Sequence, residues 1–208
     1  LARSGQSITG GSASEQFQGS AGNDRVDGAA GIDTALFSGA RASYDLTRTA
    51  EGWVVSSLAG GTDTLINVER LVFADLTLAI DLNGNGGQAY RLYQAAFNRV
   101  PDMPGLSFWI NAMDKGATLG EVAAGFASSK EFQTVYGAAP TSAEIVGRFY
   151  ANVLQRPGDA GGIAFWVDVL DTGKATLAQV LAGFSDSAEN QDGVAAVIGN
   201  GFPYTPFG

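Results

Sequence analysis

The sequence contains no cysteine and no histidine among its 208 residues. Without cysteine the chain can form neither disulfides nor thiolate nucleophiles. Without histidine it lacks Ser-His catalysis and the usual ligands of zinc and haem. Catalysis would be left to paired carboxylates, as in glycosidases, and we do not expect an enzyme, because turns and helix caps account for most Asp and Glu residues. A cysteine-free chain also suits secretion by a route that does not depend on disulfide formation.

Positive charge and long apolar runs are scarce as well. The 12 Lys and Arg residues are outnumbered by 21 Asp and Glu residues, which gives a formal net charge of −9. A surface of that sign repels nucleic-acid phosphates and anionic lipid headgroups, so neither is expected as a partner. No apolar run is long enough to cross a bilayer, and membrane insertion is not expected.

Proline is absent from the first 100 residues, and all six prolines lie at or beyond Pro101. Up to Leu82 the apolar residues alternate as they do in strands, whereas from Ala89 they recur at helical spacing. This change predicts an α+β chain with two domains, a β-rich domain over residues 1–86 and an all-α domain with a C-terminal tail over residues 87–208.

Three consecutive nine-residue blocks organise the N-terminal domain, GGSASEQFQ, GSAGNDRVD and GAAGIDTAL. Each block opens with Gly and carries an acid at its sixth position and an apolar or small residue at its eighth. The acids are Glu15, Asp24 and Asp33, and the eighth residues are Phe17, Val26 and Ala35. The apolar column extends to Ile8 and Tyr44, but the acid column does not, since Gln6 and Ala42 take its place. Two columns at one period indicate a repeated backbone geometry; the alternative is a flexible leader with chance acids.

This spacing suits a parallel β-roll that binds calcium. Six Gly-rich residues can form a turn whose carbonyls point inward, and three residues can form a short strand whose middle side chain enters a core. Two blocks make one coil, so turns that are two blocks apart stack on the same side. Carbonyl and carboxylate oxygens from stacked turns are the hard ligands that Ca²⁺ prefers.

The blocks resemble the RTX (repeat-in-toxin) nonapeptide, G-G-x-G-x-D-x-U-x, of secreted bacterial calcium-binding β-rolls. The middle block fits best, the third has a small Ala35 in the apolar place, and the first departs at Ala13 and Glu15. The resemblance implies a short roll with few calcium sites. The candidate metal ligands in these turns are Gly19, Ala21, Asp24, Gly28, Ala30 and Asp33.

A second candidate metal loop joins the two domains. Asp81, Asn83 and Asn85 match the first half of an EF-hand loop, D-x-N-x-N-G, but Leu92 stands where a bidentate Glu is needed. A turn that ends a strand is the favoured interpretation. The three residues are kept as further candidate ligands.

The C-terminal domain repeats itself. RLYQAAFNRVPDMPGLSFWINAMDKG aligns without gaps on RFYANVLQRPGDAGGIAFWVDVLDTG, and after one inserted residue ATLGEVAAGF aligns on ATLAQVLAGF. Capping boxes predict helices that start after Thr118, Ser128, Thr141 and Thr176. Each repeat should form about four short helices, and the two repeats should pack face to face.

These helices resemble a bacterial domain of unknown function that is related to the phycobilisome linker domain and is often found beside RTX repeats. Its R-x-x-D-x-x-G-Φ-x-F-W motif occurs twice, and no catalytic residue is assigned to it. We interpret its Asp as a helix cap, its Arg as a brace and its Trp as core. The alternative is a loop, presented twice, that binds a partner or an ion.

Together the resemblances predict a non-enzymatic, calcium-binding structural or interaction module of a type-I-secreted bacterial protein, extracellular or associated with the cell surface. It would act in adhesion or in S-layer or matrix assembly, and its partners would be calcium and itself, other surface proteins or polysaccharide. The alternative is the C-terminal accessory and secretion portion of an extracellular hydrolase whose catalytic domain lies upstream. The apolar tail, AVIGNGFPYTPFG, is either part of a secretion signal or a frayed or docked end.

Overall fold

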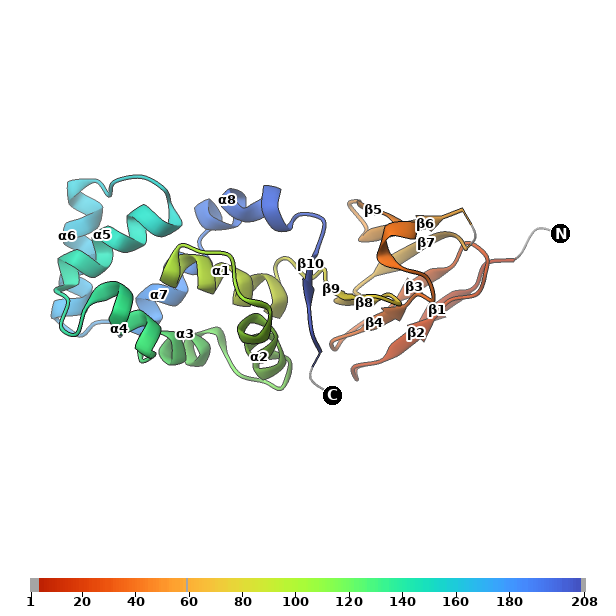
Figure 1. Ribbon diagram of the computed structural model, residues 1–208, viewed down its shortest axis with the longest axis horizontal. Coiled ribbons are helices and arrows are strands. Elements are labelled where there is room, and N and C mark those ends of the chain that lie inside the picture. The colour runs from red at the N-terminus through yellow and green to blue at the C-terminus, as the bar shows by residue number, and fades with distance from the viewer. Residues whose placement is uncertain (1–3, 59, 207–208) are drawn as a thin grey trace. The chain divides into compact units, whose positions relative to one another are not determined.

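The structure is a computed structural model that describes residues 4–58 and 60–206 (Figure 1). These residues form two compact units. The first unit comprises the described residues up to Gly86 together with those from Ile198 onwards, and the second comprises Gly87–Val197. The first unit is β-rich and the second is all-α, so the predicted α+β class is confirmed.

The nine-residue blocks fold as short strands joined by turns. The strands are β1 (Ser7–Thr9), β2 (Gln16–Gln18), β3 (Arg25–Asp27) and β4 (Thr34–Leu36). β1 pairs in parallel with β3, and β2 pairs in parallel with β4, so alternate strands belong to opposite sheets. The middle residue of β2, β3 and β4 is buried in each case. Two blocks therefore make one coil of the roll, as predicted, and each block places one side chain in the core.

After β4 the chain leaves the nine-residue period. The excursion contains the 3-10 helix η1 (Arg41–Ser43) and the strands β5 (Asp45–Arg48) and β6 (Trp53–Ser57), which form an antiparallel hairpin. Tyr44 does not continue the inward apolar column as expected, because its ring packs against Phe37 and Phe73 instead. The column continues at Leu65, opposite Val26.

The roll resumes with β7 (Gly61–Ile66), which pairs in parallel with β3, and with β8 (Arg70–Val72), which pairs in parallel with β4. Within the described residues, one sheet has the strand order β1-β3-β7-β6-β5. The other has the order β10-β9-β8-β4-β2, where β9 is Thr77–Ala79 and β10 is Phe202–Tyr204. The excursion therefore inserts a hairpin into a roll whose coils stack before and after it.

The tail docks as an edge strand of the first unit. β10 pairs antiparallel with β9 (Figure 1). The rings of Phe202 and Tyr204 are buried. This pairing covers the free edge of β9, which would otherwise expose unpaired backbone groups. Of the two alternatives given for the tail of the domain 87–208, the described residues show the docked one, and these residues belong to the β-rich unit.

The second unit contains the predicted duplication. In the part of the chain that the structure describes, eight helices follow the strands. They are α1 (Asn85–Phe97), α2 (Met103–Asp114), α3 (Leu119–Ala127), α4 (Lys130–Tyr136), α5 (Ser142–Val153), α6 (Ala160–Asp171), α7 (Leu177–Ser185) and α8 (Ala188–Ile198). Three predicted capping boxes form, at Thr118, Thr141 and Thr176. The fourth prediction is off by one residue, since Ser129 and not Ser128 caps α4 by accepting from the Phe132 N–H.

The two repeats meet through equivalent helices, because α3 packs against α7. Each helix contributes a Val and a Phe to the core, Val122 and Phe126 from α3, and Val180 and Phe184 from α7. The segments that align best between the repeats are thus the ones that pack together.

Replacing the matched glycines Gly125 and Gly183 by Ala should change the free energy of unfolding in opposite directions. A Cβ at Gly125 would strike the Trp109 ring at 2.6 Å, whereas a Cβ at Gly183 would meet nothing within 4 Å. Gly183→Ala should raise the free energy of unfolding by up to about 1 kcal/mol through helix propensity, and Gly125→Ala should lower it. Thermal unfolding of the two single variants checks this, and equal shifts of the same sign would contradict it.

Candidate functional site

Two columns of carboxylates run along the roll, one on each side. On one side Asp24 Oδ1 accepts the Gln6 N–H of the previous coil at 2.7 Å, and Asp63 Oδ1 accepts the Asp24 N–H at 3.0 Å. Each acid is thus held by the backbone of the coil before it. Asp24 is almost fully buried, with 2% of its surface exposed.

The column on the other side follows the same rule. Asp33 Oδ1 accepts the Glu15 N–H at 2.8 Å, and Glu69 Oε2 accepts the Asp33 N–H at 2.7 Å. Asp33 is completely buried. The repeated contact shows that Asp63 and Glu69 occupy the acid positions of the coil formed by the resumed chain, one on each side.

Sequence reasoning missed Asp63 and Glu69 because the excursion breaks the period. The signal that identifies them is local: each stands two residues before an inward-facing Leu, Leu65 and Leu71, as Asp24 stands two residues before Val26. A search for an acid two residues before a large apolar residue, without the requirement of a nine-residue period, would have found both.

The three acids of the predicted blocks differ in how their second oxygen is satisfied. Glu15 Oε2 accepts the Gly11 N–H at 2.6 Å, and Asp24 Oδ2 accepts the Ser20 N–H at 2.5 Å. In both turns the donor is the second residue of the block. The Ser20 hydroxyl also donates to Asp24 Oδ1 at 2.8 Å, so both oxygens of Asp24 are occupied.

Asp33 lacks the corresponding donor. The second residue of its block is Ala29, which has a positive φ of 66°, and its N–H donates to Asp27 Oδ1 at 3.1 Å instead. As a result Asp33 Oδ2 is buried and has no hydrogen-bond partner among the described residues. A buried carboxylate oxygen without a donor is costly, and it indicates a place for a cation.

The first glycine of each turn on this side lies too close to neighbouring oxygens to carry a side chain. A Cβ at Gly28 would come within 3.0 Å of both Asp33 Oδ2 and the Asn67 carbonyl oxygen. A Cβ at Gly10 would do the same with Glu15 Oε2 and the Gly28 carbonyl oxygen. Gly at these two positions therefore lets an anionic oxygen and a carbonyl oxygen both approach the backbone closely.

Three of these carboxylates have a raised pKa. Burial is the largest cause for each of them, Asp33, Glu69 and Asp63. The negative charge of a neighbouring acid adds to it: Glu15 raises the pKa of Asp33, and Asp24 raises that of Asp63. A bound cation would offset both effects, because it favours the charged form of each group.

The residues that the sequence predicts to bind a metal through their carbonyl oxygens all lie in these turns, but their surroundings differ. Gly28 lies against Asp33. Ala30 is exposed, and its N–H donates to the Gly11 carbonyl of the stacked turn at 3.1 Å. Gly19 lies against Asp24 Oδ2, and Ala21 is exposed beside it.

In the loop that joins the domains, the side chain of Asp81 has structural roles. Asp81 Oδ1 accepts from Arg70 Nη1 at 2.5 Å, and Asp81 Oδ2 accepts the Gly86 N–H at the start of α1 at 2.9 Å. Asn83 is exposed, and Leu92 is fully buried in α1. Because Asp81 already binds a guanidinium and caps a helix, we do not include this loop in the metal proposal.

The acids do not cluster tightly enough to bind a metal by side chains alone. Within residues 4–58 and 60–206, no group of three or more Asp or Glu side chains forms such a site. Any ion in the roll would therefore need carbonyl oxygens and water beside its carboxylates.

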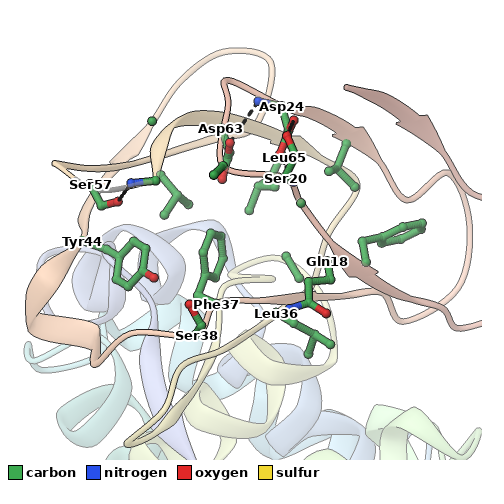
Figure 2. Close-up of a pocket in the computed structure, with 18 residues that line it drawn as sticks. Gln18, Ser20, Asp24, Leu36, Phe37, Ser38, Tyr44, Ser57, Asp63 and Leu65 are labelled. Atoms are coloured by element: carbon green, nitrogen blue, oxygen red, sulfur yellow. Dashed lines mark hydrogen bonds between the residues drawn. The ribbon is translucent and has the colours of Figure 1, made fainter. Parts of the chain in front are cut away.

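A cavity of about 330 Å³ opens where the chain leaves the roll (Figure 2). Asp24 and Asp63 lie at one end of it, and the rings of Phe37 and Tyr44 form part of the opposite wall (Figure 2). Ser57, at the end of β6, also lines it.

The repeated motif of the helical unit forms two matching networks. In the first, Arg99 binds Glu131 through Nε at 2.8 Å and lies over the Tyr93 ring at 5.1 Å. Asp102 caps α2 by accepting the Gly105 N–H at 2.8 Å. The pKa of Asp102 is lowered, first by this backbone hydrogen bond.

The second network repeats the first. Arg156 binds Glu189 at 2.8 Å and lies over the Tyr150 ring at 5.4 Å, and Asp159 caps α6 by accepting the Gly162 N–H at 2.8 Å. A Cβ at Gly162 would strike the Tyr150 hydroxyl, as one at Gly105 would strike that of Tyr93. The motif's Arg, Asp and Gly therefore have structural roles in both repeats.

The two Trp residues are equivalent but less buried than predicted. Trp109 packs on Phe126 at 5.3 Å between ring centroids, and Trp166 packs on Phe184 at 5.4 Å. Each ring is only partly buried. Their neighbour Phe108 is 53% exposed, as Phe165 is in the second repeat at 59%, so each repeat carries an aromatic side chain at its surface.

The second half of the chain is an all-α domain built from two matched repeats of four helices. The family described as a domain of unknown function (DUF4214) matches residues 88–135 and, in a second, overlapping match, residues 123–194. Together the matches cover more than half of the chain, and the chain belongs to this family. No curated protein matches it. In the part of the chain that the structure describes, no helix is long and apolar enough to cross a membrane.

Proposed function

We propose that this chain is a calcium-stabilised, non-enzymatic structural or interaction module of a secreted bacterial surface or matrix protein. The observation that carries the proposal is the pair of carboxylate columns, in which buried acids stack from coil to coil and one oxygen, Asp33 Oδ2, lacks a partner. Buried charge of one sign needs a counter-charge, and no Lys or Arg side chain is hydrogen-bonded or ion-paired to Asp33 within the described residues.

The donor set favours calcium over other ions. The groups are carboxylate and carbonyl oxygens from turns, which suit a hard cation with flexible coordination. The absence of cysteine and histidine from the whole sequence removes the ligands that softer metals prefer. These features support kinship of the roll with RTX repeats, and with it export to a calcium-rich exterior.

The cavity supports binding better than catalysis. Its two carboxylates do not form a free acid and base pair, because both oxygens of Asp24 already accept hydrogen bonds and Asp63 Oδ1 accepts the Asp24 N–H. The helical unit adds aromatic side chains at its surface, which suits contact with another copy or another extracellular protein.

Calcium titration into metal-free protein tests the proposal. Isothermal calorimetry should show saturable binding of about one Ca²⁺ per chain at the submillimolar to millimolar concentrations typical of extracellular modules. Sedimentation velocity with and without calcium would then show whether the folded module self-associates. If the wild-type chain binds no calcium even at several millimolar, the proposal is wrong.

A further inference from the structure

The cavity of about 330 Å³ in the β-rich unit combines an apolar lining with charge at one end (Figure 2). Its volume lies within the range of roughly 300–1,000 Å³ that is typical of small-molecule pockets. All of its lining residues belong to the β-rich unit, so the cavity is contained in one compact body. Aromatic rings, aliphatic groups and a few polar groups make up the lining, as in most ligand sites.

The charge at one end of the cavity comes from carboxylates. Asp24 and Asp63 line it, and none of the described Lys or Arg side chains does. Asp24 is already satisfied, since its two oxygens accept from the Gln6 N–H, the Ser20 hydroxyl and the Ser20 N–H. Asp63 is only partly buried, and its Oδ1 accepts the Asp24 N–H. Asp63 Oδ2 accepts no hydrogen bond from residues 4–58 and 60–206, so one carboxylate oxygen is open to a cationic donor.

The opposite wall of the cavity is aromatic. Phe37 and Tyr44 lie across from the two carboxylates (Figure 2). Their ring centroids are 5.1 Å apart, and both rings also pack on Phe73, at 5.3 and 5.2 Å. The Tyr44 hydroxyl accepts the Gly39 N–H at 3.1 Å. The two rings are therefore held in place before a ligand arrives, which lowers the entropic cost of binding.

The lining selects one class of ligand. Core side chains of the roll add apolar surface to the aromatic wall, namely Val26, Ala35, Val55 and Leu65. A bare inorganic cation would leave this apolar surface uncovered, and an anion would be repelled by the carboxylates. A guanidinium is less suited than an ammonium group, because a single open oxygen offers no bidentate pair.

We propose that the cavity binds a small organic ammonium compound, an amine that carries an aromatic or branched apolar body. The ammonium group donates to Asp63 Oδ2, and the apolar body lies against Phe37 and Tyr44. This ligand goes beyond the calcium binding proposed above, because it is recognised by one carboxylate oxygen and an apolar wall and needs no metal. It gives the module a small-molecule ligand in addition to its structural role.

Three probes titrated into the wild-type chain by calorimetry, in several millimolar calcium, test the ligand class. 2-Phenylethylammonium carries both the charge and an aromatic body and should bind saturably. 2-Phenylethanol has the same body without the charge, and methylammonium has the charge without the body. Each should bind at least about tenfold more weakly. Equal binding of 2-phenylethanol would overturn the recognition of an ammonium group, and no saturable binding of 2-phenylethylammonium would overturn the site itself.

A fourth probe separates a free amine from a lysine side chain of a protein partner. N-Acetyllysine amide should bind more weakly than 2-phenylethylammonium, because its narrow aliphatic chain covers less of the aromatic wall. If N-acetyllysine amide binds more tightly, the cavity takes a lysine side chain and the assignment to a small amine is wrong.

Asp63→Asn should weaken the binding of 2-phenylethylammonium by about 10–100-fold. It removes the charge, while Asn Oδ1 can still accept the Asp24 N–H. Glu69→Gln is the matched control, since Glu69 holds the same place in the other acid column, accepts the Asp33 N–H and lies outside the lining of the cavity. This control should bind within about twofold of the wild type. Equal losses in the two variants would reflect net charge alone and would overturn the site.

Ala35→Ile tests the apolar part of the cavity without a change of charge. Ala35 lines the cavity and is 3% exposed, so a larger side chain there should occupy the space of the ligand and weaken binding at least about tenfold. Circular dichroism and Trp53 emission check that each variant is folded. If Asp63→Asn or Ala35→Ile unfolds, the comparison of 2-phenylethylammonium with 2-phenylethanol on the wild type still decides.

Calcium titrated into the complex with 2-phenylethylammonium separates this site from the proposed function. The amine should stay bound. Competitive displacement by calcium would make this end of the cavity a metal position, which would overturn the amine site and leave the proposed function intact. A wild-type chain that binds the amine and no calcium would support the amine site and overturn the proposed function.

Discussion

In excess chelator the β-rich unit should lose its fold while the helical unit keeps its own. The roll buries Asp24 and Asp33 and adds Asp63 and Glu69 to the same columns, so without a cation its acids repel one another. Each nine-residue block brings only one side chain into the core, so this part of the roll has little apolar burial to offset the ordering of its backbone. Saturation with calcium at about a thousandfold above Kd would return roughly 4 kcal/mol.

Single-Trp variants separate the two units. Trp53 reports on the β-rich unit, and Trp109 or Trp166 reports on the helical unit. Chelator should shift the Trp53 emission strongly towards that of exposed indole and leave the other two nearly unchanged, because the helices are capped and share a dense aromatic core. Far-ultraviolet circular dichroism should retain its helical signal. Trp53 emission that stays native in chelator would make calcium a minor stabiliser and remove the physical basis for coupling folding to export.

Arg70→Met should destabilise the β-rich unit by about 3–5 kcal/mol, because it leaves a buried carboxylate without its counter-charge. The side chains of Arg70 and Asp81 are 2% and 7% exposed, and the Arg70 guanidinium also lies over the Tyr204 ring at 5.4 Å. The residue therefore joins β8 to the loop before α1 and to β10. Denaturant unfolding in calcium, followed by Trp53 emission, measures the loss.

Arg25→Met is the matched control. Arg25 pairs with Glu51 at 3.3 Å, but both side chains are more than half exposed, and such a pair contributes about 0–1 kcal/mol. The double variant Arg70→Met with Asp81→Leu should recover part of the lost stability, since no charge is then left buried. A loss below about 1 kcal/mol in Arg70→Met would show that this buried pair is no more important than an exposed one.

Local rules predicted the strands and helix starts of this chain well. The strands centred on Phe17, Val26 and Ala35, and the caps at Thr118 and Thr141, depend on neighbours within one turn or block, so the sequence itself contains the information. The same holds for the two helical repeats, because a duplication is visible without any knowledge of packing.

Contacts across the excursion could not be predicted in this way. The acid columns continue at Asp63 and Glu69 only because the hairpin of β5 and β6 brings the chain back into register beside β3 and β4. The orphaned oxygen of Asp33 depends on the backbone angle of Ala29, a residue type that gives no sign of a positive φ. Candidate ligands could be assigned to turns from sequence, but the difference between one turn and the next could not.

The docking of β10 on β9 has a mechanical consequence. Because the strands before and after the helices belong to one unit, a pull that separates β10 from β9 is resisted first by the hydrogen bonds between these two strands, and the helices between them carry force only after this pairing breaks. The antiparallel bond between β9 and β10 would be the first element under tension, and the Arg70 guanidinium over Tyr204 would resist its separation. In an anchored surface protein, such an arrangement would let the β-rich unit bear traction while the helices stay folded.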